Sequence, residues 1–284
     1  MAVGDPRGIG PEVVRKALQQ PLDAEVRIVG GWEDGGSGGG GKTPSDLEAG
    51  RAAAQNIEAA ARLALSGEAD AIVTGPVNKL ALHAAGYHFP GVTEFLAHIA
   101  GDIPVAMMLT TGRLRVVLVT THLSLRDAIA SVTTERVVQA GRIATDALRQ
   151  WWGITSPRLA LCALNPHAGE GGLFGDEDDR LLRPAAMALD AAGPLPADTV
   201  FVRALRGEFD AVLAPYHDVG MTAVKVSGFG TGVNVTLGLP FIRTSPDHGT
   251  AFDIAGKGIA DAGSMRASLE LAVQLVGARR QRGD

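Results

Sequence analysis

The chain has 284 residues, of which 46% are apolar and 20% are charged, and its formal net charge is −5. This balance is typical of a globular protein with one large domain or two of ordinary size. It argues against a nucleic-acid partner, because phosphate binding requires a clustered excess of Lys and Arg. No apolar run approaches the roughly 18 residues needed to cross a bilayer, and the opening MAVGDPRG lacks the pattern of an export signal. We therefore expect a cytoplasmic protein with no membrane partner.

Short apolar runs alternate with longer Ala- and Leu-rich segments along the chain. In chain order we expect a helix at 11–20, a strand at 26–30, a helix at 46–66, a strand at 71–75, helices at 77–86 and 93–100, strands at 105–110 and 114–121, a helix at 133–151, a strand at 159–164, helices at 178–192 and 197–206, strands at 211–216 and 241–245, and a helix at 263–280. Apolar strands separated by helices predict an α/β fold with a mainly parallel sheet covered on both faces. The Gly-rich segment 30–42 has no periodicity and predicts a flexible loop.

Four of the seven histidines follow apolar strands directly: His122, His167, His217 and His248. The carboxyl ends of parallel strands line one edge of a sheet, where ligands bind. Neutral imidazole is a common ligand of divalent transition metals, and three imidazoles leave an open position for a substrate oxygen. The pattern favours one shared metal site over four unrelated loop histidines, although no local spacing identifies the metal.

Three acidic residues accompany these histidines. Asp218 follows His217, Asp247 precedes His248, and Glu170 lies three residues after His167. Each is placed to orient an imidazole or to move a proton, although Glu170 could equally cap its own loop.

Two kinds of segment suggest an anion or cofactor site. TGPVNK (74–79) and GDPRGIGPE (4–12) each join a strand to a helix start, where an anion is favoured, although an ordinary turn explains them equally well. In KVSGFGTGVN (225–234) the glycines Gly228, Gly230 and Gly232 lie between Lys225 and Asn234, and this run does not have the context of a Rossmann fingerprint. Lys225 and Arg243 suit a phosphate or a carboxylate.

Several segments together resemble the 4-hydroxythreonine-4-phosphate dehydrogenase family of pyridoxal phosphate biosynthesis. They are GDPRGIGPE, TGPVNK, TTHLSLRDA, LNPHAGEGGLFGDED, GPLPADTVF, AVLAPYHDVGM and the stretch from VKVSGFGTGVN to GIADAGS. The resemblance implies two α/β/α domains, like those of isocitrate and isopropylmalate dehydrogenases, formed by 1–90 with 239–284 and by 91–238. It also implies a homodimer whose active sites are shared between subunits.

The resemblance assigns a role to each candidate residue. Metal ligands would be His122, His167 and His217, the last from the partner subunit, with Zn, Mg or Co as the ion. Substrate contacts would be Thr93, Lys225, Asn234 and Arg243, and catalytic residues Asp218 and Lys225. We expect NAD or NADP to lie near Gly228, Gly230, Gly232, Asp247 and His248, although His248 is not a ligand in the family and could be structural.

The implied reaction is oxidation and β-decarboxylation of 4-phosphooxy-L-threonine. Related family members act on 4-phospho-D-threonate, on 4-phospho-D-erythronate or on a dihydrodiol dicarboxylate, and the retained Lys225, Asn234 and Arg243 favour a phosphorylated substrate. Two other classes stay open, a metal-dependent phosphatase or hydrolase and a silent phosphometabolite-binding protein.

Two departures from the family pattern affect these expectations. The family has His before the residue equivalent to Thr93, whereas this chain has Val92, which cannot donate a hydrogen bond. This change predicts either a different substrate or weaker binding of the usual one. The region around 30–45 is also shorter than in the family.

Overall fold

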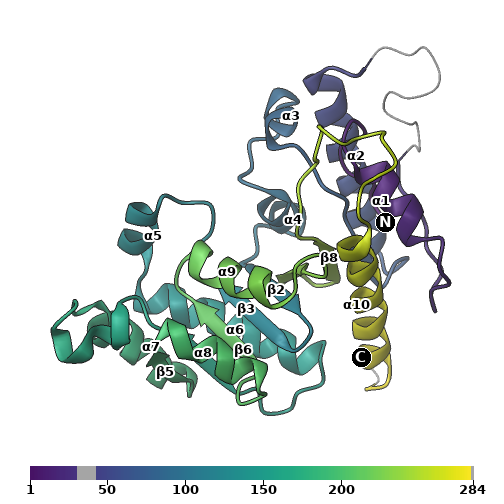
Figure 1. Cartoon of the computed structure of the whole chain (residues 1–284). Helices are drawn as coiled ribbons and strands as arrows, with labels where there is room; N and C mark the ends of the chain where they lie inside the picture. Colours follow the sequence, from purple (N-terminus) through teal and green to yellow (C-terminus); the bar gives the residue numbers. More distant parts are fainter. Residues whose placement is uncertain (31–42, 283–284) are drawn as a thin grey trace. The chain divides into compact units, whose positions relative to one another are not determined.

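The computed structural model describes residues 1–30 and 43–282, so nearly all of the Gly-rich segment predicted as a loop lies outside the described residues. Two compact units are present, Met1–Pro104 with Val233–Asp284, and Val105–Gly232. They are coloured along the chain in Figure 1 and described separately below. The predicted domain boundaries stay a prediction. Every helix within the described ranges is too short or too polar to span a membrane.

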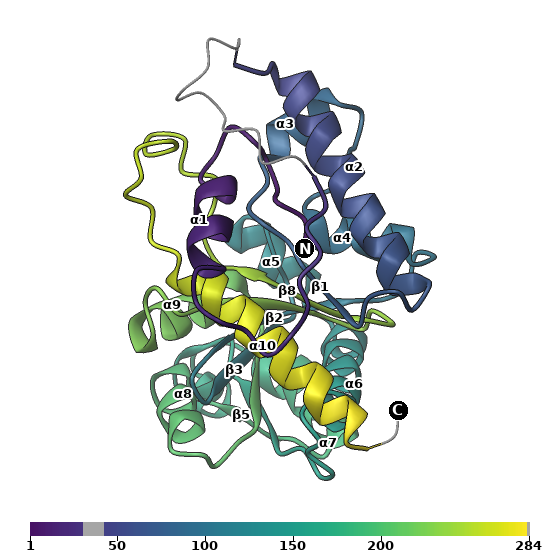
Figure 2. The same ribbon diagram turned by 90° about the vertical axis from the view of Figure 1, so that its right-hand side faces the viewer.

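The first unit combines both ends of the chain. Its elements are α1 (Gly10–Ala17), α2 (Asp46–Leu65), β1 (Ala71–Val73), α3 (Lys79–Ala84), α4 (Val92–Ile99), β7 (Val233–Leu237), β8 (Ile242–Pro246) and α10 (Gly263–Arg280). Strand β8 pairs in parallel with β1 and antiparallel with β7. The amphipathic helices α1 and α10 lie beside each other (Figure 2) and bury Val13, Val14, Met265 and Leu269 in one apolar cluster with Val73 of β1. This packing of helices onto a strand is what the alternation of elements predicts.

The predicted strand at 26–30 is wrong. Only Val29 pairs, forming an isolated parallel bridge with Ala2, which also bridges to Thr74. A single bridged residue cannot make a ladder, so the alternating apolar residues Val26 and Ile28 are only half-buried.

The second unit is a sheet flanked by helices. Its elements are β2 (Ala106–Thr111), β3 (Leu114–Leu118), α5 (Leu125–Ser131), α6 (Thr134–Gln150), β4 (Leu159–Cys162), the irregular turn Pro166–Gly172, the π turn Asp178–Leu182, α7 (Arg183–Leu189), β5 (Ala192–Leu195), α8 (Ala197–Leu205), β6 (Ala211–Ala214) and α9 (His217–Ser227). Its strands lie in the order β2-β3-β6-β4-β5. All neighbours are parallel except the hairpin of β2 and β3.

Period-two alternation builds the core of the second unit. Leu114, Val116 and Leu118 point from β3 into a cluster with α8 and α9, whereas α6 contacts the same sheet outside that cluster. Both faces are therefore covered, and the predicted α/β class is confirmed. Strands that are apolar on both faces are buried between the helices and have a defined position. The loops that follow them therefore start from defined points at the carboxyl edge of the sheet.

Several predicted elements differ from the structure. The helix at 178–192 is wrong at its end, because α7 stops at Leu189, Asp190 takes a left-handed conformation with φ of 50°, and β5 follows. Helices α5 and α9 and strand β7 were not predicted. Polar residues interrupt the apolar pattern in α5 and α9, whereas β7 alternates apolar and polar residues but begins inside the glycine-rich run 225–234.

Candidate active site

A small pocket lies at the carboxyl ends of β3 and β6 in the second unit. These strands are neighbours and parallel, so the segments after them meet at one edge. The pocket has a volume of about 110 Å³. Its lining residues are Thr120, Thr121, His122, Leu123, Leu125, Ala128, Tyr216, His217 and Asp218. Two of the predicted metal ligands therefore face one cavity.

His122 and His217 lie close together at this pocket. Their ring centroids are 5.8 Å apart. His217 Nδ1 and Asp218 Oδ1 are 2.7 Å apart, the arrangement in which Nδ1–H donates to the carboxylate and Nε2 faces a ligand. Asp218 is thus within hydrogen-bonding distance of His217, and its predicted role in orienting the imidazole stays a prediction. His122 has a φ of 50°, in the left-handed region that side chains other than Gly rarely adopt.

His167 lies after β4, the strand on the other side of β6. Six consecutive residues, from His167 to Gly172, have positive φ, with 54° at His167 itself. The ring of His167 is 6.3 Å from that of Phe174. The three histidines therefore follow three neighbouring parallel strands, β3, β6 and β4.

Within one chain, the side chains at this edge are of the right chemical type to bind a divalent metal, but they do not form a complete ligand set. Imidazoles at one sheet edge, one of them oriented by a carboxylate, are a suitable donor set for an ion such as zinc. However, residues 1–30 and 43–282 contain no group of three His, Cys, Asp or Glu side chains close enough to hold an ion. The ligand from a partner subunit that the family resemblance implies stays a prediction.

A second polar cluster lies in the first unit around Arg243 of β8. Arg243 is 3% exposed. Its Nε and Nη2 donate to Thr74 Oγ1 at 3.2 and 2.7 Å, and its Nη1 donates to Thr236 Oγ1 at 2.9 Å. Thr93 Oγ1 of α4 lies 3.3 Å from Thr236 Oγ1. Two threonine hydroxyls therefore accept from one buried guanidinium, and a third, that of Thr93, lies beside Thr236.

The electrostatics of this cluster are mixed, because a buried cation lies near a carboxylate. Burial lowers the pKa of Arg243 to about 10, and the nearby Glu94 partly offsets this effect, so the side chain stays cationic at neutral pH. Asn234 Oδ1 and Glu94 Oε2 are buried and have no hydrogen-bond partner within the described chain. Thr93, Asn234 and Arg243, predicted as substrate contacts, belong to this one unit. Thr74 and Thr236 were missed, although Thr236 lies on the same face of β7 as Asn234, two residues along.

Comparison with known proteins identifies the family. Residues 41–272 match the family model described as "Pyridoxal phosphate biosynthetic protein PdxA". A 4-hydroxythreonine-4-phosphate dehydrogenase of Beijerinckia indica is 44% identical over 317 residues, covering 97% of this chain and 94% of that protein. This chain belongs to the PdxA family.

Other relatives of this PdxA-family chain agree in fold. The D-threonate 4-phosphate dehydrogenase of Salmonella typhimurium is 42% identical, covering 97% of this chain and 98% of that protein. The crystal structure of a 4-hydroxythreonine-4-phosphate dehydrogenase from Klebsiella pneumoniae has a TM-score of 0.82 and 38% identity, covering 97% and 98% of the two chains. An isocitrate dehydrogenase from Methylococcus capsulatus shares the fold alone, with a TM-score of 0.53 and 16% identity over 98% of this chain and 85% of that one. The predicted family and the predicted isocitrate dehydrogenase-like fold are confirmed.

The glycine-rich segment of this PdxA-family chain joins α9 to β7. Lys225 lies in the last turn of α9, with Nζ 5.8 Å from the Phe229 ring. Gly228 ends the helix against Thr111, where a Cβ atom would collide with the Thr111 side chain. Close packing thus explains Gly228 without a ligand, and the predicted cofactor contacts at Gly228, Gly230 and Gly232 stay a prediction.

Asp247 and His248 follow β8 in the first unit. The Asp247 N–H donates to Ser264 Oγ at 3.1 Å, and Ser264 Oγ donates to Asp247 Oδ1 at 3.2 Å, which ties the strand end to the start of α10. His248 Nδ1 lies 3.0 Å from the Gly249 carbonyl, and its Nε2 is buried without a partner among the described residues. The structure gives Asp247 a structural role and leaves its predicted cofactor role as a prediction.

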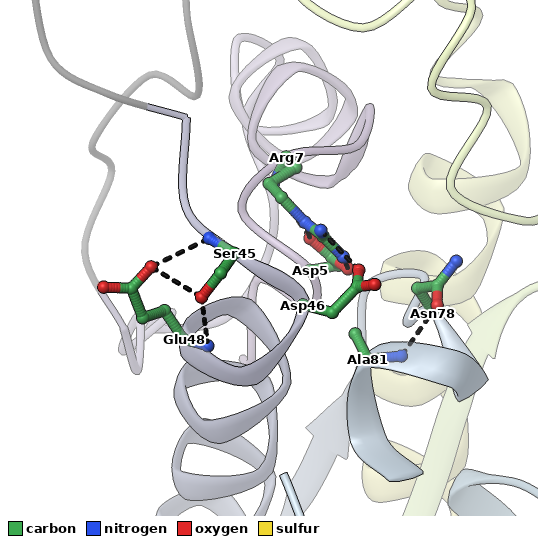
Figure 3. A network of polar contacts seen from close by, with 7 residues as sticks. All are labelled: Asp5, Arg7, Ser45, Asp46, Glu48, Asn78 and Ala81. Carbon is green, nitrogen blue, oxygen red and sulfur yellow. Dashed lines mark hydrogen bonds and ion pairs between the residues drawn. The ribbon is translucent and has the colours of Figure 1, made fainter. Parts of the chain in front are cut away.

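The GDPRGIGPE segment is held by an ion-pair network (Figure 3). Arg7 donates to both oxygens of the fully buried Asp5 at 3.1 and 3.0 Å, and to Asp46 at the start of α2 at 2.6 Å. The Arg7 guanidinium also lies 5.3 Å from the centre of the Phe252 ring. In TGPVNK, the Asn78 side chain caps α3 by accepting from the Ala81 N–H. Both segments therefore have a structural explanation, and their predicted anion sites stay a prediction.

Proposed function

We propose that this PdxA-family protein is a dehydrogenase of a phosphorylated hydroxy acid that uses NAD and a divalent metal ion. The observation that carries the proposal is that His122 and His167 of one chain follow β3 and β4, parallel strands of one sheet whose carboxyl ends lie at the same edge. The names of the full-length relatives, which are dehydrogenases of 4-hydroxythreonine-4-phosphate or D-threonate 4-phosphate, support it.

The preferred substrate in this proposal is 4-hydroxythreonine-4-phosphate, and the alternative is D-threonate 4-phosphate. Both carry a phosphate and a carboxylate, so each needs cationic and hydroxyl donors. Arg243 supplies a guanidinium that can bind an oxyanion in bidentate fashion, and Thr93 and Thr236 supply hydroxyls beside it.

The metal would be held by His122 and His167 with the partner subunit's His217. A divalent ion there supplies a Lewis acid that lowers the pKa of a bound hydroxyl. The Asp218 carboxylate accepts the Nδ1–H of His217 and so fixes the tautomer whose Nε2 faces the ligand.

Oxidation would remove the hydroxyl proton and transfer hydride from the same carbon to NAD. The family resemblance assigns the role of the general base, which accepts this proton, to Asp218 or to Lys225. The product is a β-keto acid, which loses carbon dioxide, and the enolate left behind takes up one proton. Overall, one hydroxy-acid carboxylate and one NAD⁺ give one ketone, one NADH and carbon dioxide, because the proton released on oxidation is taken up after decarboxylation.

A substrate panel tests the proposal. 4-Phosphooxy-L-threonine, 4-phospho-D-threonate and 4-phospho-D-erythronate are each assayed with NAD or NADP and Zn²⁺, Mg²⁺ or Co²⁺ for reduced nicotinamide. We expect turnover of at least one of the three. Release of inorganic phosphate without reduced nicotinamide would instead indicate a hydrolase.

Val92 provides a specificity test within the same panel. It occupies the first turn of α4, next to Thr93, and carries no hydrogen-bond donor. Val92→His is expected to raise kcat/KM on 4-phosphooxy-L-threonine by roughly tenfold, the size of one recovered hydrogen bond. Equal kcat/KM values for the variant and the wild type would make Val92 a neutral replacement.

A further inference from the structure

We infer that Asp178 is a positioning residue that sets the orientation of His167. The inference rests on the proposed function, because His167 matters for catalysis only if it holds the metal. It concerns the turn Pro166–Gly172, which carries His167 beyond the end of β4.

Asp178 binds the segment between β4 and this turn. It is 0% exposed, and it begins the π turn that precedes α7. Its Oδ1 accepts the Leu164 N–H at 2.8 Å and its Oδ2 accepts the Asn165 N–H at 2.9 Å. One buried carboxylate therefore fixes two successive peptide groups immediately before the turn that bears His167.

The turn needs such an anchor because its backbone is unfavourable. His167, Ala168 and Glu170 have φ values of 54°, 56° and 41°, where a Cβ atom crowds the following carbonyl oxygen. Such conformations persist only where the surrounding structure determines them. Within the turn, the Ala168 N–H donates to the Asn165 carbonyl at 3.1 Å and the Phe174 N–H donates to the Gly169 carbonyl at 3.2 Å. Asn165 thus binds Asp178 through its N–H and the first part of the left-handed run through its carbonyl.

A carboxylate is required at this position by its hydrogen-bonding pattern. Two converging N–H donors need two acceptor oxygens, and an Asn side chain offers only one oxygen and directs an NH₂ group at the other donor. A buried N–H without an acceptor is unfavourable, so the loop would move to find a partner.

A second contact ties the turn to the residue before Asp178. Asn165 Nδ2 donates to Glu177 Oε2 at 2.9 Å. A Cβ atom on Gly169 would lie 2.9 Å from the Gly175 carbonyl oxygen, so the two halves of the loop are in close contact. The segment 175–178 therefore packs against the left-handed turn, and Asp178 is the buried residue of this segment.

The test uses the full-length, metal-free protein and titrates Zn²⁺ alone by calorimetry. Asp178→Asn removes one acceptor and is expected to weaken Zn²⁺ binding at least tenfold and to speed amide hydrogen exchange in 164–175 while other regions keep their protection. Asp178→Glu restores both acceptor oxygens and is expected to bind Zn²⁺ more tightly than Asp178→Asn. The matched control is Asp179→Asn at the adjacent, half-exposed carboxylate paired with Arg183, which is expected to bind Zn²⁺ as the wild type does.

The outcomes separate this inference from the proposed function. The inference is overturned if the Asp178→Asn variant binds Zn²⁺ as tightly as the wild type and its amide hydrogen exchange in 164–175 is unchanged. If the wild type itself fails to bind metal, the proposed function fails, and the exchange measurement still decides whether Asp178 orders the turn. If Asp178→Asn does not fold, slow exchange of the Leu164 and Asn165 amides in the wild type supports the inference, and rapid exchange overturns it.

Discussion

At the scale of single residues, His122 and His167 share a left-handed backbone, with φ of 50° and 54°. A residue other than Gly pays roughly 1–2 kcal/mol for this conformation. Strained residues of this kind concentrate at functional sites, where the surrounding structure holds them in place. Both histidines lie at carboxyl ends of parallel strands, so backbone geometry and sheet position indicate the same functional edge.

Because of this strain, we expect substitutions at His167 to affect stability and function separately. His167→Gly should raise the free energy of unfolding by about 1 kcal/mol relative to His167→Ala, because Gly adopts positive φ without a Cβ penalty. Both variants should lose metal binding and turnover. Thermal unfolding and Zn²⁺ titration measure the two effects, and normal turnover by either variant would remove His167 from the site.

Arg243 is the residue whose contacts make the clearest prediction for substrate binding. Arg243→Lys replaces a three-bond guanidinium fork by a single ammonium group. KM for the phosphorylated substrate should rise roughly tenfold to hundredfold, since hydrogen bonds to charged groups are worth about 1.5–3 kcal/mol. Steady-state kinetics measure the change, with the exposed Arg280→Lys as a control that leaves KM unchanged. An unaltered KM in a folded Arg243→Lys protein would place the substrate elsewhere.

At the scale of elements, α1 holds the loop at 258–260. Glu12 accepts the N–H groups of Gly258 and Ala260 at 3.3 and 2.8 Å, and Lys16 donates to the carbonyls of the same two residues at 2.9 and 2.7 Å. Burial acts to raise the pKa of Glu12, but hydrogen bonds from Lys16 and Ala260 outweigh it and hold the pKa below its ordinary 4.5. A carboxyl whose pKa is lowered by folding stabilises the fold above its ordinary pKa and loses that effect as pH falls through the folded value.

Glu12→Gln should therefore be less stable than the wild type at neutral pH, and the difference should shrink well below pH 4.5. Thermal unfolding at several pH values measures it. Glu68→Gln, at an exposed carboxylate 3.8 Å from Arg27, should show little difference at any pH. If the stability difference between the wild type and Glu12→Gln stayed constant over these pH values, the charge of Glu12 would not stabilise the loop.

The elements with clear periodicity were predictable from sequence. The helices expected at 46–66 and 263–280 correspond to Asp46–Leu65 and Gly263–Arg280, because a capping box at Ser45 and a long helical pattern mark them. Strand β7 has the alternating pattern of a strand, with Asn234 and Thr236 between its apolar residues, but it begins inside the glycine-rich run 225–234, which was interpreted as a loop. Sequence reasoning thus failed where glycines adjoin a strand.

At the scale of the whole molecule, the sequence predicted which residues lie at strand ends but not which strands are neighbours. His122 and His217 are far apart in sequence, and only the pairing of β3 with β6 brings their rings to 5.8 Å. Sheet order depends on long-range packing that no local pattern encodes. For the same reason, Thr74 and Thr236 could not be assigned to Arg243 before the order β1-β8-β7 was known.

The proposed sharing of the metal between subunits is testable by mixing inactive variants. His122→Ala and His217→Ala should each be inactive, but reassembly of the two together should restore about one quarter of wild-type activity, since half of the randomly paired dimers carry one intact site of two. His122→Ala mixed with His167→Ala should stay inactive, because both ligands come from one subunit. No recovery in the first mixture would mean that His122 and His217 of a single chain hold the ion together.

The most direct measurement is the absorbance of reduced nicotinamide after NAD is added to the protein with 4-phosphooxy-L-threonine or 4-phospho-D-threonate, before and after chelation of divalent metal. The account predicts that the absorbance rises with one of the two substrates, stops rising on chelation and resumes when the metal is restored. Turnover that is indifferent to chelation, or no reduction of NAD with either substrate at any metal concentration, would contradict it.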